Sequence, residues 1–303
     1  MTVKKTVVPA VAGTTPSTTK KAPKKSADKL KIEKLEAKIA TLQEDLVKKN
    51  EPQPAVKEPV VLVIPYLHSK AAGKELLLAI RAWEKNFSEL TDIVIVGDML
   101  PELNGVIGHI PHRAESDNPQ VDVASKLAAV VASGLVPDRF ILSNDDIFPV
   151  APIGMEDLLT KKITGPLREK GKESTTYREN SIRTIAALKA EGITQPKDYA
   201  THLPVVLEKE KLAEVLAHYQ CLKNGHMIST LYFNHHFPDA RPIVVQNDIR
   251  GSIMISVWKP NPDPAALRKV MHDRQFVNVN NFGWPHVEPY LVKFFPKKSA
   301  FEK

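Results

Sequence analysis

Apolar positions between residues 60 and 150 follow two alternating patterns, and together these predict the fold. Val60–Leu67, Asp92–Asp98 and Arg139–Asp146 each hold a short continuous apolar run, which is typical of buried parallel strands. Between these runs, Gly73–Phe87 and Val121–Gly134 repeat their apolar residues at helical spacing. Strands that alternate with helices over short connections predict a doubly wound, Rossmann-like α/β sheet.

The pattern is less regular after residue 150. Three segments are predicted to be helices: Ser181–Gly192, Glu208–Tyr219 and Val287–Phe295. Two are predicted to be short strands: Pro242–Asp248 and Ser252–Trp258. Ser229–Phe237 is treated as a strand, in which the adjacent His235 and His236 would face opposite sides, so that at most one could enter a given site.

The first 59 residues differ from the rest in composition. Residues 1–29 are rich in Thr, Ser, Pro, Ala and Lys, which predicts a disordered basic tail. Residues 30–49 place five apolar side chains at heptad spacing, at Ile32, Leu35, Ile39, Leu42 and Leu46, which predicts a short coiled-coil helix and a homo-oligomer. The alternative is a helix that lies on its own globular domain. A proline-rich linker, 50–59, separates this helix from the domain predicted at 60–303.

The net charge of +7 comes from the tail. Residues 1–57 hold 13 lysines and six acids, whereas the remaining 246 residues hold 29 basic and 29 acidic side chains. The balanced domain gives no support to nucleic-acid binding. There is no secretory h-region and no apolar run of transmembrane length, so a cytoplasmic protein is expected. The one cysteine, Cys221, excludes an internal disulfide and is expected to be a buried apolar residue.

Two adjacent aspartates, Asp145 and Asp146, end an apolar strand in the stretch "RFILSNDDIF". In open α/β sheets, ligands bind beyond the carboxyl ends of the strands. Hard oxygen ligands at such a position suit Mg²⁺ or Mn²⁺, which could bridge to the diphosphate of a nucleotide-sugar. The alternative is that the pair caps a helix or begins a turn. No glycine-rich phosphate loop is present, so phosphate would be bound by the metal and by side chains.

Further candidate residues follow downstream. His202 precedes a proline and a predicted helix, where it could accept a proton from an attacking hydroxyl or simply lie at the surface. Asn280 and Asn281 end a short predicted strand. They could bind a sugar or a phosphate, or form an Asx turn before Gly283.

Four stretches, taken in order, resemble the Stealth family of capsular-polysaccharide phosphotransferases and their animal relative, the lysosomal-enzyme N-acetylglucosamine-1-phosphotransferase. They are "LLLAIRAWEKNFSELTDIVIVGD", "RFILSNDDIF", "ATHLPVVLEKEKLAEVL" and "QFVNVNN…FFPKKSAFE". The second is similar to the family's "FIYLNDDVF". The resemblance spans about residues 62–302.

The resemblance implies a nucleotide-sugar transferase domain of the GT-A type with a nucleotide-sugar donor and a glycan acceptor. It places His202 on the family's proposed catalytic histidine and Arg81 on a family arginine. Asp145 and Asp146 would bind the metal, and Asn144, Asn234, Asn280 and Asn281 would position substrate. Three features depart from the family pattern: "VVLVIPYLHSK" lacks the acids of its first block, Asn234 stands where an arginine is expected, and Asn281 replaces an aspartate.

Three functions are consistent with these residues. The first is the metal-dependent transfer of a sugar-1-phosphate from a nucleotide-sugar to an acceptor glycan hydroxyl. The second is glycosyl transfer, in which the metal stabilises a leaving nucleoside diphosphate. The third is a non-catalytic glycan-binding or assembly protein with a degenerate transferase domain. The sequence names neither the donor nor the acceptor.

Overall fold

The computed structural model describes residues 58–173, 175–245, 253–260 and 262–303, and upstream of these only Lys34, Ala37, Lys38 and Thr41. The chain divides into two units, Met1–Lys57 and Glu58–Lys303, and the second unit contains the fold. The four upstream residues are helical and exposed. The predicted basic tail 1–29, the apolar heptad positions within 30–49 and most of the predicted linker 50–59 lie outside the described residues.

The first half of the folded unit alternates strands and helices as predicted. In chain order its elements are β1 (Val61–Tyr66), η1 (His68–Lys70), α2 (Glu75–Asn86), β2 (Asp92–Gly97), β3 (Gly108–Pro111), α3 (Pro119–Ala132) and β4 (Arg139–Leu142). The short edge strand β3 was not predicted.

Five strands form the central sheet in the order β3-β2-β1-β4-β7, where β7 is Val205–Glu208. All neighbours are parallel except β4 and β7. The chain thus builds outward from β1 to β3 and then crosses back to place β4 on the other side of β1. This reversal is the topological switch point of a doubly wound sheet, and ligands bind beyond the carboxyl ends of the strands beside it. The predicted α/β class is confirmed.

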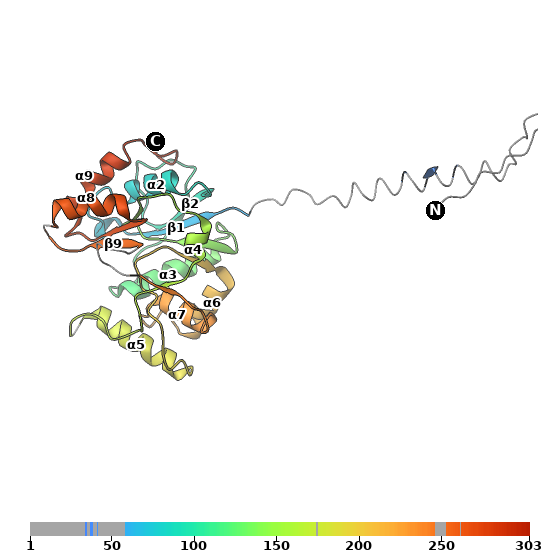
Figure 1. Ribbon diagram of the computed structural model, residues 1–303. Coiled ribbons are helices and arrows are strands. Elements are labelled where there is room, and N and C mark those ends of the chain that lie inside the picture. Colours follow the sequence, from blue (N-terminus) through green and yellow to red (C-terminus); the bar gives the residue numbers. More distant parts are fainter. Residues whose placement is uncertain are drawn as a thin grey trace, which may run out of the picture. The chain divides into compact units, whose positions relative to one another are not determined.

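Helices cover both faces of this sheet (Figure 1). Val61 and Val63 of β1 pack in a cluster with Leu127 of α3, whereas Leu62 and Ile64 pack in a second cluster with α2. Successive side chains of a strand point to opposite faces. A strand covered on both faces therefore has a continuous apolar sequence instead of an alternating one.

The second half adds a smaller sheet and further helices. The elements are β5 (Ile147–Pro149), α4 (Met155–Leu159), β6 (Lys162–Ile163), α5 (Thr176–Ala190), α6 (Lys209–His218), α7 (Ile228–His236), β8 (Ile243–Val244), β9 (Met254–Val257), α8 (Pro264–Asp273), β10 (Phe276–Val279) and α9 (Trp284–Phe294). Strands β5, β10 and β9 form a three-stranded sheet, with β5 antiparallel and β9 parallel to β10. Within the described part of the chain, no helix is both long and apolar enough to cross a bilayer.

Two local predictions were wrong. Ser229–Phe237 is not a strand, because its residues lie almost entirely in helix α7. Its deeply buried Ile228, Leu231 and Tyr232 are spaced by three and four residues, which places them on one helical face. The second error concerns His202, which precedes strand β7, and helix α6 begins only after that strand.

Candidate functional site

The two aspartates lie in a turn that connects the two sheets. Strand β4 ends at Leu142, and the Ile147 amide donates to the Asn144 carbonyl (3.4 Å) as β5 begins. Asp145 and Asp146 are half-buried in this turn, while Asn144 is exposed. The pair therefore lies at the carboxyl end of β4, as the sequence predicted, and next to the end of β1 in the sheet.

Strand β10 holds this turn from the side. The Asp146 carbonyl accepts from the Val279 amide (3.1 Å) and from the side-chain amide of Asn278 (3.3 Å). Asn278 is buried, and its Oδ1 accepts from the indole nitrogen of Trp258 (2.9 Å). Sequence reasoning missed Asn278 and Trp258. The available signal was a polar amide inside the apolar strand "FVNV".

Carboxylates gather at the turn with little positive charge to balance them. Burial raises the pKa of Asp145 to about 7, and repulsion from Asp146 adds to the shift. Burial also raises the pKa of Asp146 to about 7, with a further contribution from Glu75 of α2. Oδ1 of Asp146 is buried and has no hydrogen-bond partner among the described residues. A cation bound at this turn would satisfy that oxygen and stabilise the ionised carboxylates.

The donor set fits a hard divalent cation. Carboxylate oxygens are the ligands that Mg²⁺ and Mn²⁺ prefer. Among the described residues, no third carboxylate or imidazole completes a close three-ligand set with Asp145 and Asp146. A cation held by the pair would take its remaining ligands from water and phosphate, as Mg²⁺ commonly does.

A cleft of about 710 Å³ opens beside the aspartates. It is lined by the end of β1, by η1, by the first turns of α3 and by the aspartate turn. The cleft therefore lies at the switch point between β1 and β4, where the fold predicts a ligand site. Asn281, which follows β10, also lines it.

Two lysines supply positive charge to this cleft. Lys126 of α3 is buried, and its ammonium group contacts Oδ2 of Asp122 at 2.6 Å. Its charge opposes the rise in the pKa of Asp145. Lys70 of η1 lines the same cleft. Sequence reasoning missed Lys126, and the available signal was a single lysine inside the otherwise apolar stretch "VASKLAAVV".

His202 lines a second cavity of about 180 Å³, which shares Asn144 and Val123 with the cleft. The two cavities therefore adjoin at the aspartate turn. The imidazole meets the indole ring of Trp258 edge-on, with 5.1 Å between the ring centroids. His202 has a φ of 53°, in the left-handed region that non-glycine residues seldom adopt and that is enriched at functional sites.

The ionisation of His202 suits a proton acceptor. His202 is exposed, but the atoms packed around its ring reduce hydration and lower the pKa of the imidazole below its ordinary value. The positive charge of Lys170 lowers it further, while Asp198 opposes the shift. The ring is therefore neutral near pH 7, which is the state that accepts a proton.

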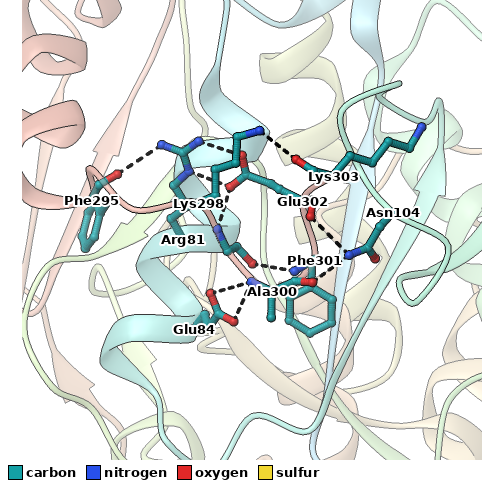
Figure 2. Close-up of polar contacts among 10 residues, drawn as sticks. Arg81, Glu84, Asn104, Phe295, Lys298, Ala300, Phe301, Glu302 and Lys303 are labelled. Atoms are coloured by element: carbon teal, nitrogen blue, oxygen red, sulfur yellow. Dashed lines mark hydrogen bonds and ion pairs between the residues drawn. The ribbon is translucent and has the colours of Figure 1, made fainter.

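Arg81 lies elsewhere and binds the C-terminal segment, as Figure 2 shows. Its Nε and Nη2 donate to the two carboxylate oxygens of Glu302 at 2.6 Å each, and its Nη1 donates to the Phe295 carbonyl at 3.2 Å. Arg81 does not line the aspartate cleft or the His202 cavity. In this arrangement its guanidinium joins α2 to the end of the chain. Arg81 lines a separate cleft of about 550 Å³ with Glu102 and Lys298, and its substrate role stays a prediction.

Besides Asn144, which lines both cavities, the other three predicted asparagines take different places. Asn234 is buried, and its side-chain amide bonds with both the amide and the carbonyl of Lys197 and with the Thr230 carbonyl. Asn280 accepts from the Gly283 amide at 3.0 Å, three residues on, so it caps the turn before α9; an Asx turn would bond the amide two residues on. Asn281 alone of the three lines the cleft.

Cys221 is fully buried, and burial raises the pKa of its thiol to about 12. A thiol of this kind stays protonated and is a poor nucleophile. The expectation of a buried apolar residue is confirmed.

The fold and the cleft define a Rossmann-like α/β domain with an acidic pair at its switch point. No protein-family model matches the chain. No curated protein matches it either.

Solved structures with a similar course of the chain include a 4-diphosphocytidyl-2C-methyl-D-erythritol synthase, with a TM-score of 0.37, 12% identity, and coverage of 71% of this chain and 99% of the other. A 2-C-methyl-D-erythritol 4-phosphate cytidylyltransferase from Thermus thermophilus also has a TM-score of 0.37, with 11% identity and coverage of 70% and 97%. Likeness at this level does not define an activity.

Proposed function

We propose that this chain is a metal-dependent transferase that moves a sugar-1-phosphate from a nucleotide-sugar to a hydroxyl of an acceptor glycan, as its resemblance to the Stealth family implies. The observation that carries the proposal is the Asp145–Asp146 turn. It places two carboxyl groups with raised pKa, and one buried oxygen that no described residue bonds, at the carboxyl end of β4. Such a turn at the switch point of a doubly wound sheet suits a cation that carries phosphate.

Asp145 and Asp146 would hold Mg²⁺ or Mn²⁺, and the bound ion would neutralise charge on the diphosphate of the donor. Lys126 and Lys70 line the same cleft and would contribute further positive charge toward the phosphates. These lysines offer a substitute for the arginine that the family pattern places at Asn234. Asn281 would donate a hydrogen bond from its amide where the family has a carboxylate.

His202 would act as the general base. The acceptor hydroxyl oxygen forms a bond to phosphorus, the bond from phosphorus to the nucleoside monophosphate oxygen breaks, and a neutral imidazole nitrogen takes the hydroxyl proton. Its lowered pKa keeps the imidazole ready for this step near neutral pH. Asn144, which lines both cavities, would contact substrate between the aspartate pair and His202.

A second candidate is glycosyl transfer with release of a nucleoside diphosphate. The observation that favours it is that, among the described residues, the cations lining the cleft are lysines. The two positions where the family has an arginine do not supply one to the cleft, because Arg81 and Asn234 are both bonded within the protein. A bidentate arginine is the usual partner of a transferred phosphate group. A non-catalytic glycan-binding protein is the third outcome, if a donor binds and is not turned over.

The test is a panel of nucleotide-sugars with Mg²⁺ or Mn²⁺, in which the released nucleotide is identified. Release of a nucleoside monophosphate supports the proposal, and release of a diphosphate supports the second candidate. Asp145→Asn combined with Asp146→Asn should abolish turnover without unfolding the chain. Asp239→Asn, a change at an exposed aspartate outside both cavities, should leave turnover intact.

A further inference from the structure

A cluster of metal-binding residues lies on helices α6 and α7. Glu214 of α6 and His235 and His236 of α7 bring one carboxylate oxygen and one nitrogen from each imidazole within 4.8 Å of one another. Among the described residues, no other set of three His, Cys, Asp or Glu side chains comes this close. None of the three lines the aspartate cleft or the His202 cavity.

The helical conformation of α7 makes this cluster possible. In a strand, consecutive side chains point to opposite faces. In an α-helix, consecutive residues are about 100° apart, so both can reach one side of the element. His235 and His236 occupy the last turn of α7, and their ring centroids are 4.8 Å apart. The end of a helix with free carbonyl groups also favours positive charge.

The geometry around His235 approaches that of a metal site. Its Nε2 lies 3.3 Å from Oε1 of Glu214. Two ligands of a tetrahedral zinc ion, with bonds of about 2.0–2.2 Å, are separated by roughly 3.3–3.6 Å. The side chain of Glu214 is 59% exposed, so it can shift to complete the coordination.

Both imidazoles have the second contact that orients a metal-binding histidine. The Nδ1 of His235 lies 2.9 Å from the hydroxyl of Tyr219. The Nε2 of His236 donates to the Lys211 carbonyl at 2.9 Å, which leaves the lone pair of a neutral ring on Nδ1. Each ring is thus fixed by one bond and retains one nitrogen for a cation.

We propose that Glu214, His235 and His236 form a Zn²⁺ site that joins α6 to α7, separate from the cation site of the aspartate turn. Two imidazoles and one carboxylate are a common zinc donor set, and the fourth position is left for water or another ligand. Imidazole donors favour zinc over Mg²⁺, for which the aspartate pair is suited. The bound ion would take the place of the proton that Nε2 of His235 shares with Glu214.

The test measures zinc binding by the untagged full chain with isothermal titration calorimetry. The chain carries Asp145→Asn and Asp146→Asn throughout, so that zinc at the aspartate turn is not counted. We expect one Zn²⁺ per chain, a melting temperature that rises with zinc concentration, and no competition from Mg²⁺. Co²⁺ in place of zinc should show the visible absorption of four-coordinate cobalt.

Substitutions then assign the ligands. Tyr219→Phe removes an outer contact and should lower zinc affinity by ~10–100-fold. His235→Gln combined with His236→Gln removes two ligands and should lower it further. His272→Gln removes an exposed histidine of α8 and should leave binding unchanged. Circular dichroism without zinc verifies that each variant folds. The proposal would be overturned if the His235→Gln, His236→Gln variant bound zinc as tightly as the chain with the unsubstituted cluster. It would also be overturned if the chain with the unsubstituted cluster bound no zinc.

Discussion

A single buried amide sets the position of the acidic turn. Asn278 donates to the Asp146 carbonyl and accepts from Trp258, so it connects the turn to an indole that also contacts His202. Partners of this kind orient the groups that bind substrate or metal without contacting the ligand themselves. At the residue scale, the site depends on such buried polar groups as much as on the aspartates.

Asn278→Leu should therefore weaken cation binding at the turn. We expect Mn²⁺ affinity to fall by about 10-fold, and the free energy of unfolding to fall by about 1–3 kcal/mol because buried polar partners lose their bonds. Asn234→Leu is the matched control, since Asn234 is also buried and bonded. It should cost similar stability and leave Mn²⁺ affinity unchanged. Equal losses of Mn²⁺ affinity in both variants would contradict the role given to Asn278.

His226 predicts a pH dependence of folding. Burial lowers its pKa to about 4, and the charge of Arg183 adds to the shift. The unfolded chain has the ordinary value of ~6.5. Between these two values the unfolded state binds a proton that the folded state does not, so the contribution of His226 to the free energy of unfolding should fall as the pH drops from about 6.5 to 4. The raised pKa values of Asp145 and Asp146 act in the opposite direction over this range, so the effect of His226 is measured by difference. At ~1.4 kcal/mol per pKa unit, the loss reaches about 3 kcal/mol.

Urea unfolding between pH 4 and 8 measures this effect. Relative to the native chain, His226→Gln should be more stable at pH 4 than at pH 8, because it lacks the proton that destabilises the fold at low pH, while His272→Gln, at an exposed position, should follow the native curve. Parallel curves for the native chain and His226→Gln would show that another group controls the acid response.

At the scale of elements, two connections hold the parts of the folded unit together. The aspartate turn leads from β4 in the five-stranded sheet directly into β5 of the three-stranded sheet. The second connection is the cluster of Figure 2, in which residues 298–303 return to α2 and to the segment after β2. Both connections use polar contacts between segments that are far apart in sequence.

Arg81→Met should destabilise the fold. Glu302 is nearly inaccessible, with 3% of its side chain exposed, and would lose a bidentate partner. We expect a loss of about 2–4 kcal/mol in urea unfolding, at or below the range for breaking a buried ion pair. Lys85→Ala, which removes an exposed contact with the Phe294 carbonyl, should cost less than about 1 kcal/mol. A stable Arg81→Met protein with weakened donor binding would instead support the substrate role predicted from the sequence.

At the scale of the whole molecule, charge and fold are separated along the chain. The excess of lysine lies before residue 58, whereas the folded unit Glu58–Lys303 has balanced charge. The three hydrophobic clusters are all formed by residues of that unit. A unit with its own core is expected to fold by itself.

A chain shortened to residues 58–303 should therefore keep its melting temperature within a few degrees. If the heptad positions of residues 30–49 mediate self-association, as the sequence predicts, the full chain should sediment as an oligomer and the shortened chain as a monomer. Identical sedimentation of the two would favour the alternative, a helix that lies on its own domain.

The sequence by itself determined the elements up to β4, apart from η1 and the short edge strand β3, and the place of Asp145 and Asp146, because these follow from local patterns. Continuous apolar runs predict buried strands, and a strand's carboxyl end is known once the strand is known. The sequence also located the charge excess and the buried cysteine.

Only the tertiary structure decided which polar groups meet. It placed Lys126 beside the aspartates, Asn278 under their turn and Arg81 on Glu302, 221 residues away in sequence. It also folded residues 228–236 as a helix and so brought His235 and His236 into one cluster. The physical reason is that a polar side chain is satisfied by whichever partner the packing of distant segments brings near, and no local spacing records that partner.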